Sequence, residues 1–138
     1  MPSLFDPIRL GDLQLPNRIV MAPMTRSRAN PAGEPTELHV EYYRQRASAG
    51  LVISEGVYAS HEGKGYCRTP GIVTAGQVDA WRAVTNAVHE AGGRFAMQLM
   101  HCGRIGHPDN KVPGTDAVAP SAIRANAKIF TEQGMQPI

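Results

Sequence analysis

Short apolar stretches alternate with polar, turn-forming segments over most of this chain. Residues 8–15 alternate apolar and polar side chains around a Gly-Asp pair, which predicts a short β-hairpin with glycine at the position that needs a positive φ. Residues 19–24 form a continuous apolar run, which is typical of a strand buried on both faces. Similar runs predict two further strands, over about 51–55 and about 95–100.

Two helices are predicted between these strands. Thr36 is a suitable N-cap for a helix over roughly 37–48, which would end near Gly50. The second helix spans about 77–91 and is terminated by a Gly-Gly pair. Its apolar positions recur at helical spacing: Val78, Trp81, Val84 and Val88. Beyond residue 101 the pattern becomes irregular, and the chain is expected to end inside a long loop.

The order of elements is therefore hairpin, strand, helix, strand, helix, strand. Buried strands that alternate with helices imply an α/β fold with a parallel sheet and right-handed crossovers. A doubly wound sheet and a (β/α)8 TIM barrel both satisfy this order. The barrel is favoured because each strand is followed by a polar, glycine-rich loop. A whole barrel needs about 250 residues, so we expect an incomplete one: the hairpin and roughly the first three βα units.

Composition narrows the class of protein. The chain has 138 residues, of which 42% are hydrophobic and 19% charged, as in an ordinary globular domain. A net charge of +2 without a Lys/Arg run gives no reason to expect nucleic acid or a membrane as a partner. Because neither a signal peptide nor a membrane span is recognisable, a cytoplasmic protein is expected. Cys67 and Cys102 lack C-x-x-C spacing and are expected to be free thiols, although a disulfide between them stays open.

The candidate chemistry lies where the predicted strands end. Pro23 lies at the end of the first strand and Thr25 directly follows it; they let a hydroxyl and backbone groups face a ligand, or they are a strand-ending proline and a threonine that caps its own turn. Gly56 follows the second strand and permits a planar ligand to approach the backbone, or is an ordinary turn glycine. Gln98 near the end of the third strand has an amide donor and acceptor that suit a pyrimidine-like edge. Alternatively, Gln98 bonds only to neighbouring backbone.

Other kinds of site receive little support. His101 and His107 lie in a loop region with no third ligand nearby, so no metal site is expected. The sequence Gly63-Lys64-Gly65 lacks the upstream glycine and the Ser or Thr of a phosphate-binding loop. Ser54 lacks the flanking glycines of a nucleophile elbow.

Four segments in order along the chain resemble the old yellow enzyme family of FMN-dependent ene-reductases, in particular the bacterial N-ethylmaleimide and pentaerythritol tetranitrate reductases. They are LFDPIRLGDLQLPNRIVMAPMTRSRA, EYYRQRASAGLVISEG, KGYCRTPGI and MQLMHCGR. The resemblance covers essentially the whole chain. It implies a (β/α)8 barrel with an N-terminal hairpin lid and with FMN at the carboxyl ends of the strands.

The resemblance also assigns residues to the cofactor. The family's flavin contacts from its first three strands correspond to Pro23, Met24, Thr25, Gly56 and Gln98. Thr25 is expected near the carbonyl edge of the flavin, where a donor would tune the reduced ring, and its identity places the chain in the threonine-bearing branch of the family. Gln98 is expected to bond the pyrimidine edge.

Two further residues are expected to bind the substrate. Tyr66, in the loop after the second strand, would line the pocket above the flavin. Met100 occupies a position where the similar reductases carry tryptophan. A smaller and more flexible thioether would widen or reshape that pocket, which predicts an altered substrate scope or stereochemical preference.

The implied activity is oxidation of NADPH or NADH by FMN, followed by hydride transfer to an activated C=C bond. Small α,β-unsaturated carbonyl, maleimide or nitro compounds are the expected substrates. The catalytic residues are unknown: the substrate-carbonyl donors and the proton-donating tyrosine of the family are expected beyond residue 138. The remainder of the barrel is expected to be needed, from the same or another chain. Alternatives are a non-catalytic fragment or split-chain module, or a relative such as the dienoyl-CoA reductases, although no iron–sulfur cysteine cluster is present.

Overall fold

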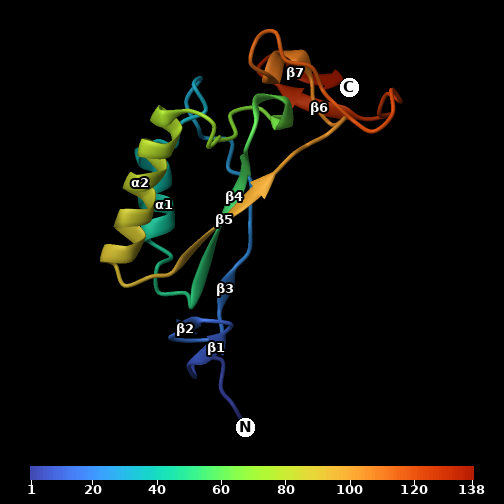
Figure 1. Cartoon of the computed structure of the whole chain (residues 1–138). Coiled ribbons are helices and arrows are strands. Elements are labelled where there is room, and N and C mark those ends of the chain that lie inside the picture. The colour runs from blue at the N-terminus through green and yellow to red at the C-terminus, as the bar shows by residue number, and fades with distance from the viewer.

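A parallel three-stranded sheet forms the centre of the structure, a computed structural model that describes all residues 1–138. Its strands are β3 (Val20–Met21), β4 (Leu51–Tyr58) and β5 (Phe95–Met100), in that order across the sheet. Both pairs, β3 with β4 and β4 with β5, are parallel. Figure 1 shows the carboxyl ends of the strands pointing toward the end of the molecule where the chain terminates.

Two strands differ in length from the sequence prediction, while β5 has the bounds that were expected. Of the strand expected over 19–24, only Val20–Met21 pairs with β4. The residues after Met21 form no ladder hydrogen bonds with that strand. The strand expected over 51–55 continues to Tyr58. Gly56 therefore lies inside a strand and does not follow its end.

Helices α1 (Glu37–Arg44) and α2 (Ala75–Glu90) both pack on one face of the sheet (Figure 1). A doubly wound sheet carries helices on both faces, whereas a barrel carries them all outside. The strands also follow one another in sequence order without a reversal. The sequence left two folds open, a doubly wound sheet and a TIM barrel. The strand order and the position of both helices agree with the barrel.

Helix α1 is shorter than the range 37–48 expected from the sequence. After Arg44 the chain continues in tight turns, in which Ala47 N–H donates to the carbonyl three residues earlier, at Arg44 (3.1 Å), and Ala49 N–H donates to that of Arg46 (3.1 Å). Such i to i−3 bonds tighten and end an α-helix.

Helix α2 begins two residues before the predicted start, because Thr74 caps it. Gln77 N–H donates to Thr74 Oγ1 (3.2 Å), and Thr74 N–H donates to Gln77 Oε1 (3.2 Å), so the two residues form a capping box. The Gln77 amide also donates to the Ala32 carbonyl (2.8 Å) and to Tyr58 Oη (3.0 Å). One buried glutamine thus joins the start of α2 to the end of β4.

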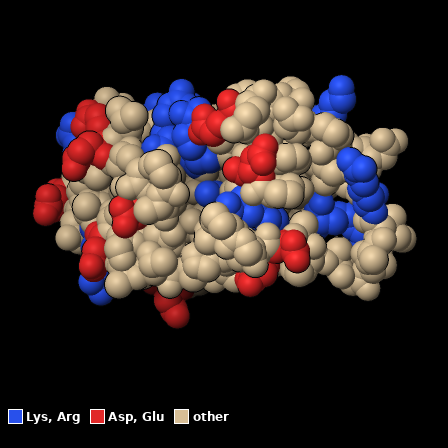
Figure 2. All heavy atoms as spheres, turned by 90° about the horizontal axis from the view of Figure 1, so that it is seen from above, with Lys and Arg blue, Asp and Glu red and all other residues tan.

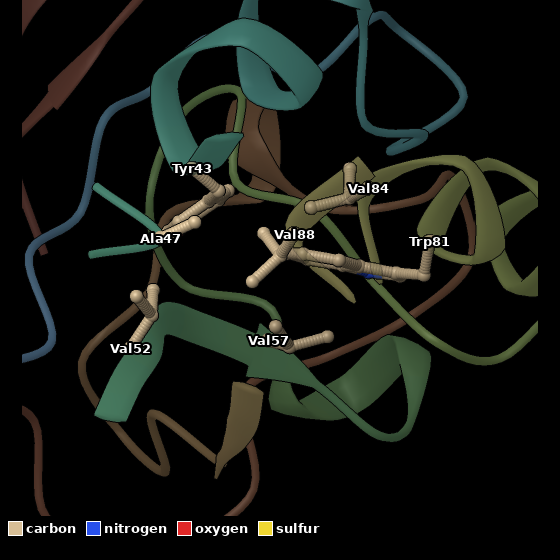
Figure 3. Packing of buried hydrophobic residues seen from close by; sticks show 7 residues of the cluster. All are labelled: Tyr43, Ala47, Val52, Val57, Trp81, Val84 and Val88. Atoms are coloured by element: carbon tan, nitrogen blue, oxygen red, sulfur yellow. The ribbon is translucent and has the colours of Figure 1, made fainter. Parts of the chain in front are cut away.

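The core lies between the two helices and the sheet (Figure 3). Trp81 and Val84 form a buried stripe on α2, as the helical spacing predicted, while Val78 is only half-buried. Burying a side chain of this size stabilises a fold by about 1.5–3 kcal/mol. The buried cluster comprises Tyr43, Ala47, Val52, Val57, Trp81, Val84 and Val88.

A hairpin lies at each end of the chain. Strands β1 (Ile8–Leu10) and β2 (Leu13–Leu15) form the expected N-terminal hairpin, in which Gly11 has a φ of 58°. Strands β6 (Lys128–Thr131) and β7 (Gly134–Pro137) form a second, antiparallel hairpin. This segment was predicted to be part of a long loop, and that prediction is wrong. Its turn depends on Gly134, whose φ is 100°, and alternation in so short a segment was too weak to indicate strands.

Charged side chains of both signs are spread among neutral ones on the face seen from the carboxyl ends of the strands (Figure 2). Neither α1 nor α2 has an apolar stretch of the length that a membrane span requires. Cys67 and Cys102 are both free thiols.

Candidate functional site at the carboxyl ends of the strands

The three predicted strand-end motifs meet at one end of the sheet. Gly56 of β4 is the register partner of Gln98 of β5. On the other side of β4, Arg26 N–H donates to Glu55 Oε2 (3.1 Å), which brings the segment after β3 alongside the same part of β4. Pro23, Met24 and Thr25 directly precede this anchor. The fold therefore brings the five predicted cofactor residues to the same end of the sheet, two of them on β4 and β5 and three on the segment that follows β3.

The residues of β5 divide between the two faces of the sheet. Phe95 and Met97 pack against the core below the helices. Because side chains alternate along a strand, Gln98 and Met100 lie on the opposite, open face. Met100 covers Gly56: a Cβ built at Gly56 would stand 2.6 Å from Met100 Cε. Gly56, Gln98 and Met100 therefore share the open face.

The polar groups of this face have no partner within the chain. Gln98 is exposed, and its amide group forms no side-chain hydrogen bond, so the alternative in which it bonds only to neighbouring backbone does not hold. Thr25 is exposed, and its hydroxyl caps no turn of its own. Met24 is 58% exposed beside it, while Pro23 is half-buried. A donor, an acceptor and an apolar surface are thus free to contact a ligand.

Tyr66 is carried by a loop that is fixed against the segment after β5. Cys102 N–H donates to the Gly63 carbonyl (2.9 Å), and the Asn110 amide donates to the Gly65 carbonyl (3.1 Å). The Tyr66 ring is 40% exposed, and its hydroxyl forms no hydrogen bond. The structure thus places Tyr66 at the same end of the sheet as Met100, next to the chain that continues from β5.

Sequence reasoning missed two buried residues that support the site. Ser54 and Glu55 are both fully buried, and each is hydrogen-bonded to a neighbouring element. The Tyr43 hydroxyl, on α1, accepts a hydrogen bond from the main-chain N–H of Glu55 and donates one to the carboxylate of Glu55. Nothing in the local pattern identified them, because their partners are distant in sequence.

The electrostatics beneath the site are governed by burial. Burial raises the pKa of the Tyr43 hydroxyl, and the nearby Glu55 carboxylate raises it further, while the hydrogen bond from Glu55 N–H acts in the opposite direction. His39 Nε2 stands 3.4 Å from Glu55 Oε1, but its N–H is not aligned for a hydrogen bond. His39 Nδ1 accepts from Thr36 N–H (2.9 Å).

The two histidines that were considered as metal ligands from the sequence accept hydrogen bonds from nearby backbone N–H groups. His101 Nδ1 accepts from Gly103 N–H (3.0 Å), and His107 Nδ1 accepts from Asp109 N–H (3.2 Å). No group of three or more His, Cys, Asp or Glu side chains is placed to hold a metal ion.

A hollow of about 190 Å³ lies elsewhere, between α1 and the segment after β3, and none of the predicted flavin residues lines it.

The fold and the site together define a singly wound parallel α/β structure with a ligand face at the carboxyl ends of its strands. The sequence profile of the NADH:flavin oxidoreductase / NADH oxidase family matches residues 3–137. The chain belongs to this family.

Individual relatives agree with this assignment. The old yellow enzyme homologue from Zymomonas mobilis superposes with a TM-score of 0.92 at 50% identity, over 99% of this chain and 38% of that one. Flavin oxidoreductase hxnT from Emericella nidulans is 44% identical over 93% of this chain and 34% of its own length. A probable flavin mononucleotide-dependent alkene reductase from Leishmania infantum is 39% identical over 87% and 33%, respectively. The chain thus spans about a third of the length of the curated relatives it matches.

Proposed function

We propose that this chain forms one side of the FMN site in an NAD(P)H-dependent ene-reductase, with β3, β4 and β5 as the first three strands of a (β/α)8 barrel. The observation that carries the proposal is the open face shared by Gly56 and Gln98, with Thr25 next to it. The Gln98 amide and the Thr25 hydroxyl are exposed and have no partner in the chain, and all three residues lie where barrel enzymes bind their ligands.

The residues fit a flavin. Gly56 adds no side chain to the open face, so only the flexible side chain of Met100 lies between its backbone and a planar ring. The Gln98 amide offers both a donor and an acceptor, as the pyrimidine edge of the ring requires. Thr25 offers a hydroxyl donor, and Pro23 and Met24 offer apolar surface beside it. The set therefore matches one edge of an isoalloxazine in shape and in hydrogen-bonding capacity.

In this function the chain's own residues bind and orient, and FMN supplies the hydride chemistry when it is bound. Gln98 would hold the pyrimidine edge in register with β4. Thr25 would donate a hydrogen bond where negative charge collects on reduction, which stabilises the reduced state. Met100 and Tyr66 would border the space for a small activated alkene. The groups that orient the substrate carbonyl and donate the proton belong to the rest of the protein.

The remaining parts of the proposal concern the whole protein. Several large apolar side chains at or beside the sheet are exposed, among them Val20 (46%) and Leu99 (63%), and the rest of a barrel from the same or another chain would cover them. A cytoplasmic location accords with the two free thiols.

The test uses the full-length protein that contains this segment. We expect a yellow protein with flavin absorbance that oxidises NADPH or NADH faster when 2-cyclohexen-1-one is present. Gln98→Ala is expected to weaken FMN binding, whereas Gln14→Ala, an exposed strand glutamine in the N-terminal hairpin, leaves it unchanged. A colourless protein without alkene-dependent oxidation would refute the proposal and support a non-catalytic fragment or split-chain module.

A further inference from the structure

Strand β4 carries one residue more than β5 across the site. Ile53 pairs with Ala96, but the next partners are Gly56 and Gln98, with a register shift between them. Three steps along β4 therefore match two steps along β5. This is a β-bulge, which inserts an unpaired residue and bends the strand that carries it.

The bulge decides which residue of β4 meets the open face. In an unbroken register, Glu55 would stand opposite Gln98, and its carboxylate would project from the open face. A shift of one residue moves side chains to the other face of a sheet. In the observed register, Glu55 turns toward α1 and Gly56 takes the place beside Gln98. The bulge replaces a carboxylate by a glycine at the ligand face.

Two fully buried hydroxyl groups form hydrogen bonds with the backbone N–H and carbonyl groups that have no partner in the ladder at the bulge. Ser54 Oγ accepts from Gln98 N–H (3.0 Å) and donates to the Glu55 carbonyl (2.7 Å). Tyr43 Oη, from α1, accepts from Glu55 N–H (2.8 Å). Both side chains are 0% exposed. An unpaired buried N–H or carbonyl is costly, so these bonds favour the bulged register over others.

Glu55 also forms a hydrogen bond with the segment after β3. Because Glu55 points away from the open face, its Oε2 is free to accept from Arg26 N–H (3.1 Å), and its Oε1 lies 3.4 Å from Tyr43 Oη. Arg26 directly follows Thr25. The bulge thus fixes the backbone on which Thr25 is carried, as well as the pairing of Gly56 with Gln98.

We propose that Tyr43 and Ser54 are positioning residues for the ligand face, which act through the β4 bulge and touch neither cofactor nor substrate. Their hydroxyl groups hold the register that places Gly56 beside Gln98 and the anchor that directs Thr25. The inference rests on the proposed flavin site for its functional consequence, while the register itself is a property of this chain.

The test removes each hydroxyl from the full-length protein with little change of shape, by Tyr43→Phe and Ser54→Ala. The Tyr43→Phe variant would keep the ring contacts with Trp81 and Phe95. The matched controls are Tyr42→Phe and Ser48→Ala, whose hydroxyl groups form no hydrogen bond. Two variants at separate hydroxyls keep the test decisive if one of them fails to fold.

Two readouts separate this inference from the proposed function. A crystal structure of each variant reads the pairing of β4 with β5 without reference to flavin, and we expect Gly56 to be displaced from Gln98 in at least one of them. FMN titration is expected to show binding weakened by about tenfold, with a shifted flavin midpoint potential, and no change in the controls.

An unchanged register together with unchanged FMN affinity and potential would overturn the inference. A displaced register with unchanged FMN affinity and potential would also overturn it, because the bulge would then serve the core alone. If the wild-type protein binds no FMN, the proposed function fails, and the positioning role fails with it even where the structures show that both hydroxyls hold the register.

Discussion

The side chain of Met100 lies over Gly56, so that a Cβ at Gly56 would stand 2.6 Å from Met100 Cε and 2.7 Å from Met100 Sδ. The glycine is predicted to face the cofactor and the methionine to face the substrate. Their contact makes these two positions interdependent: what stands at position 56 determines where the thioether lies, and the reverse.

Gly56→Ala is expected to fold with a loss of less than about 1 kcal/mol, because the obstacle is the end of a flexible side chain that can move. Gly65→Ala is the contrasting variant. There the added methyl would run into the Ile105 carbonyl and stand 2.5 Å from Cys102 Cβ, so a loss of about 1–3 kcal/mol is expected. Urea denaturation measures both. Equal losses would show that Met100 is held as rigidly as backbone.

Met100→Trp is expected to change the ratio of product stereoisomers, because a rigid indole would replace a flexible thioether beside the predicted substrate space. Glycine at position 56 leaves room for the larger ring, so the protein should still fold. Product analysis by chiral chromatography in the full-length protein checks the effect. Identical product ratios would remove Met100 from the substrate pocket.

Thr25→Ala is expected to lower the flavin midpoint potential by about 30–60 mV, which corresponds to one lost hydrogen bond of about 1.5–3 kcal/mol to a charged group. FMN should still bind, because Gln98 and the Gly56 backbone remain. Thr85→Ala is the control, since its hydroxyl bonds only to the Arg82 carbonyl on α2. Potentiometric titration gives the result, and a potential equal to that of the control would contradict the role of Thr25.

The strand-end residues could be predicted because their signals are local. Thr25 directly follows an apolar run, and Pro23 and Gln98 lie within such runs. The start of α2 was predicted two residues late, at about residue 77, but it was readable in principle, since Thr74 and Gln77 have capping-box spacing. The β4 bulge was not, because it depends on the pairing of two strands distant in sequence, and its hydrogen bonds join Ser54 to Gln98 at a separation of 44 residues. Such relationships are fixed by packing, and no local pattern carries them.

Asn17 is expected to be important for stability, because it joins the entry to β3 to the turn before β4. Its Oδ1 accepts from Ile19 N–H (3.0 Å) and Gly50 N–H (2.7 Å), and its amide donates to the Ser48 carbonyl (2.9 Å). Asn17→Ala should cost about 1–3 kcal/mol.

Asn17→Asp keeps the accepting oxygen and should cost less. Asn86→Ala, on the exposed surface of α2, should change stability by no more than about 0.5 kcal/mol. Thermal or urea unfolding ranks the three variants. The proposed role of Asn17 fails if its alanine variant is as stable as Asn86→Ala.

The buried hydroxyl of Tyr43 should make the fold sensitive to alkaline pH. Burial raises the pKa of this hydroxyl above its ordinary value of 10.0, so the folded state holds the proton more tightly than the unfolded state does. The resulting contribution to stability is fully present below about pH 10 and is lost as the pH rises further, by about 1.4 kcal/mol per pH unit. Tyr43→Phe removes this contribution.

The difference in unfolding free energy between wild type and Tyr43→Phe should therefore be constant between about pH 7 and about pH 9. Above about pH 10 it should shrink, because only the wild type loses stability by ionising this tyrosine when it unfolds. Urea denaturation at a series of pH values measures the difference. A gap that stays constant up to about pH 11 would show that the folded protein does not raise the pKa of the Tyr43 hydroxyl above that of the unfolded chain, and the prediction would fail.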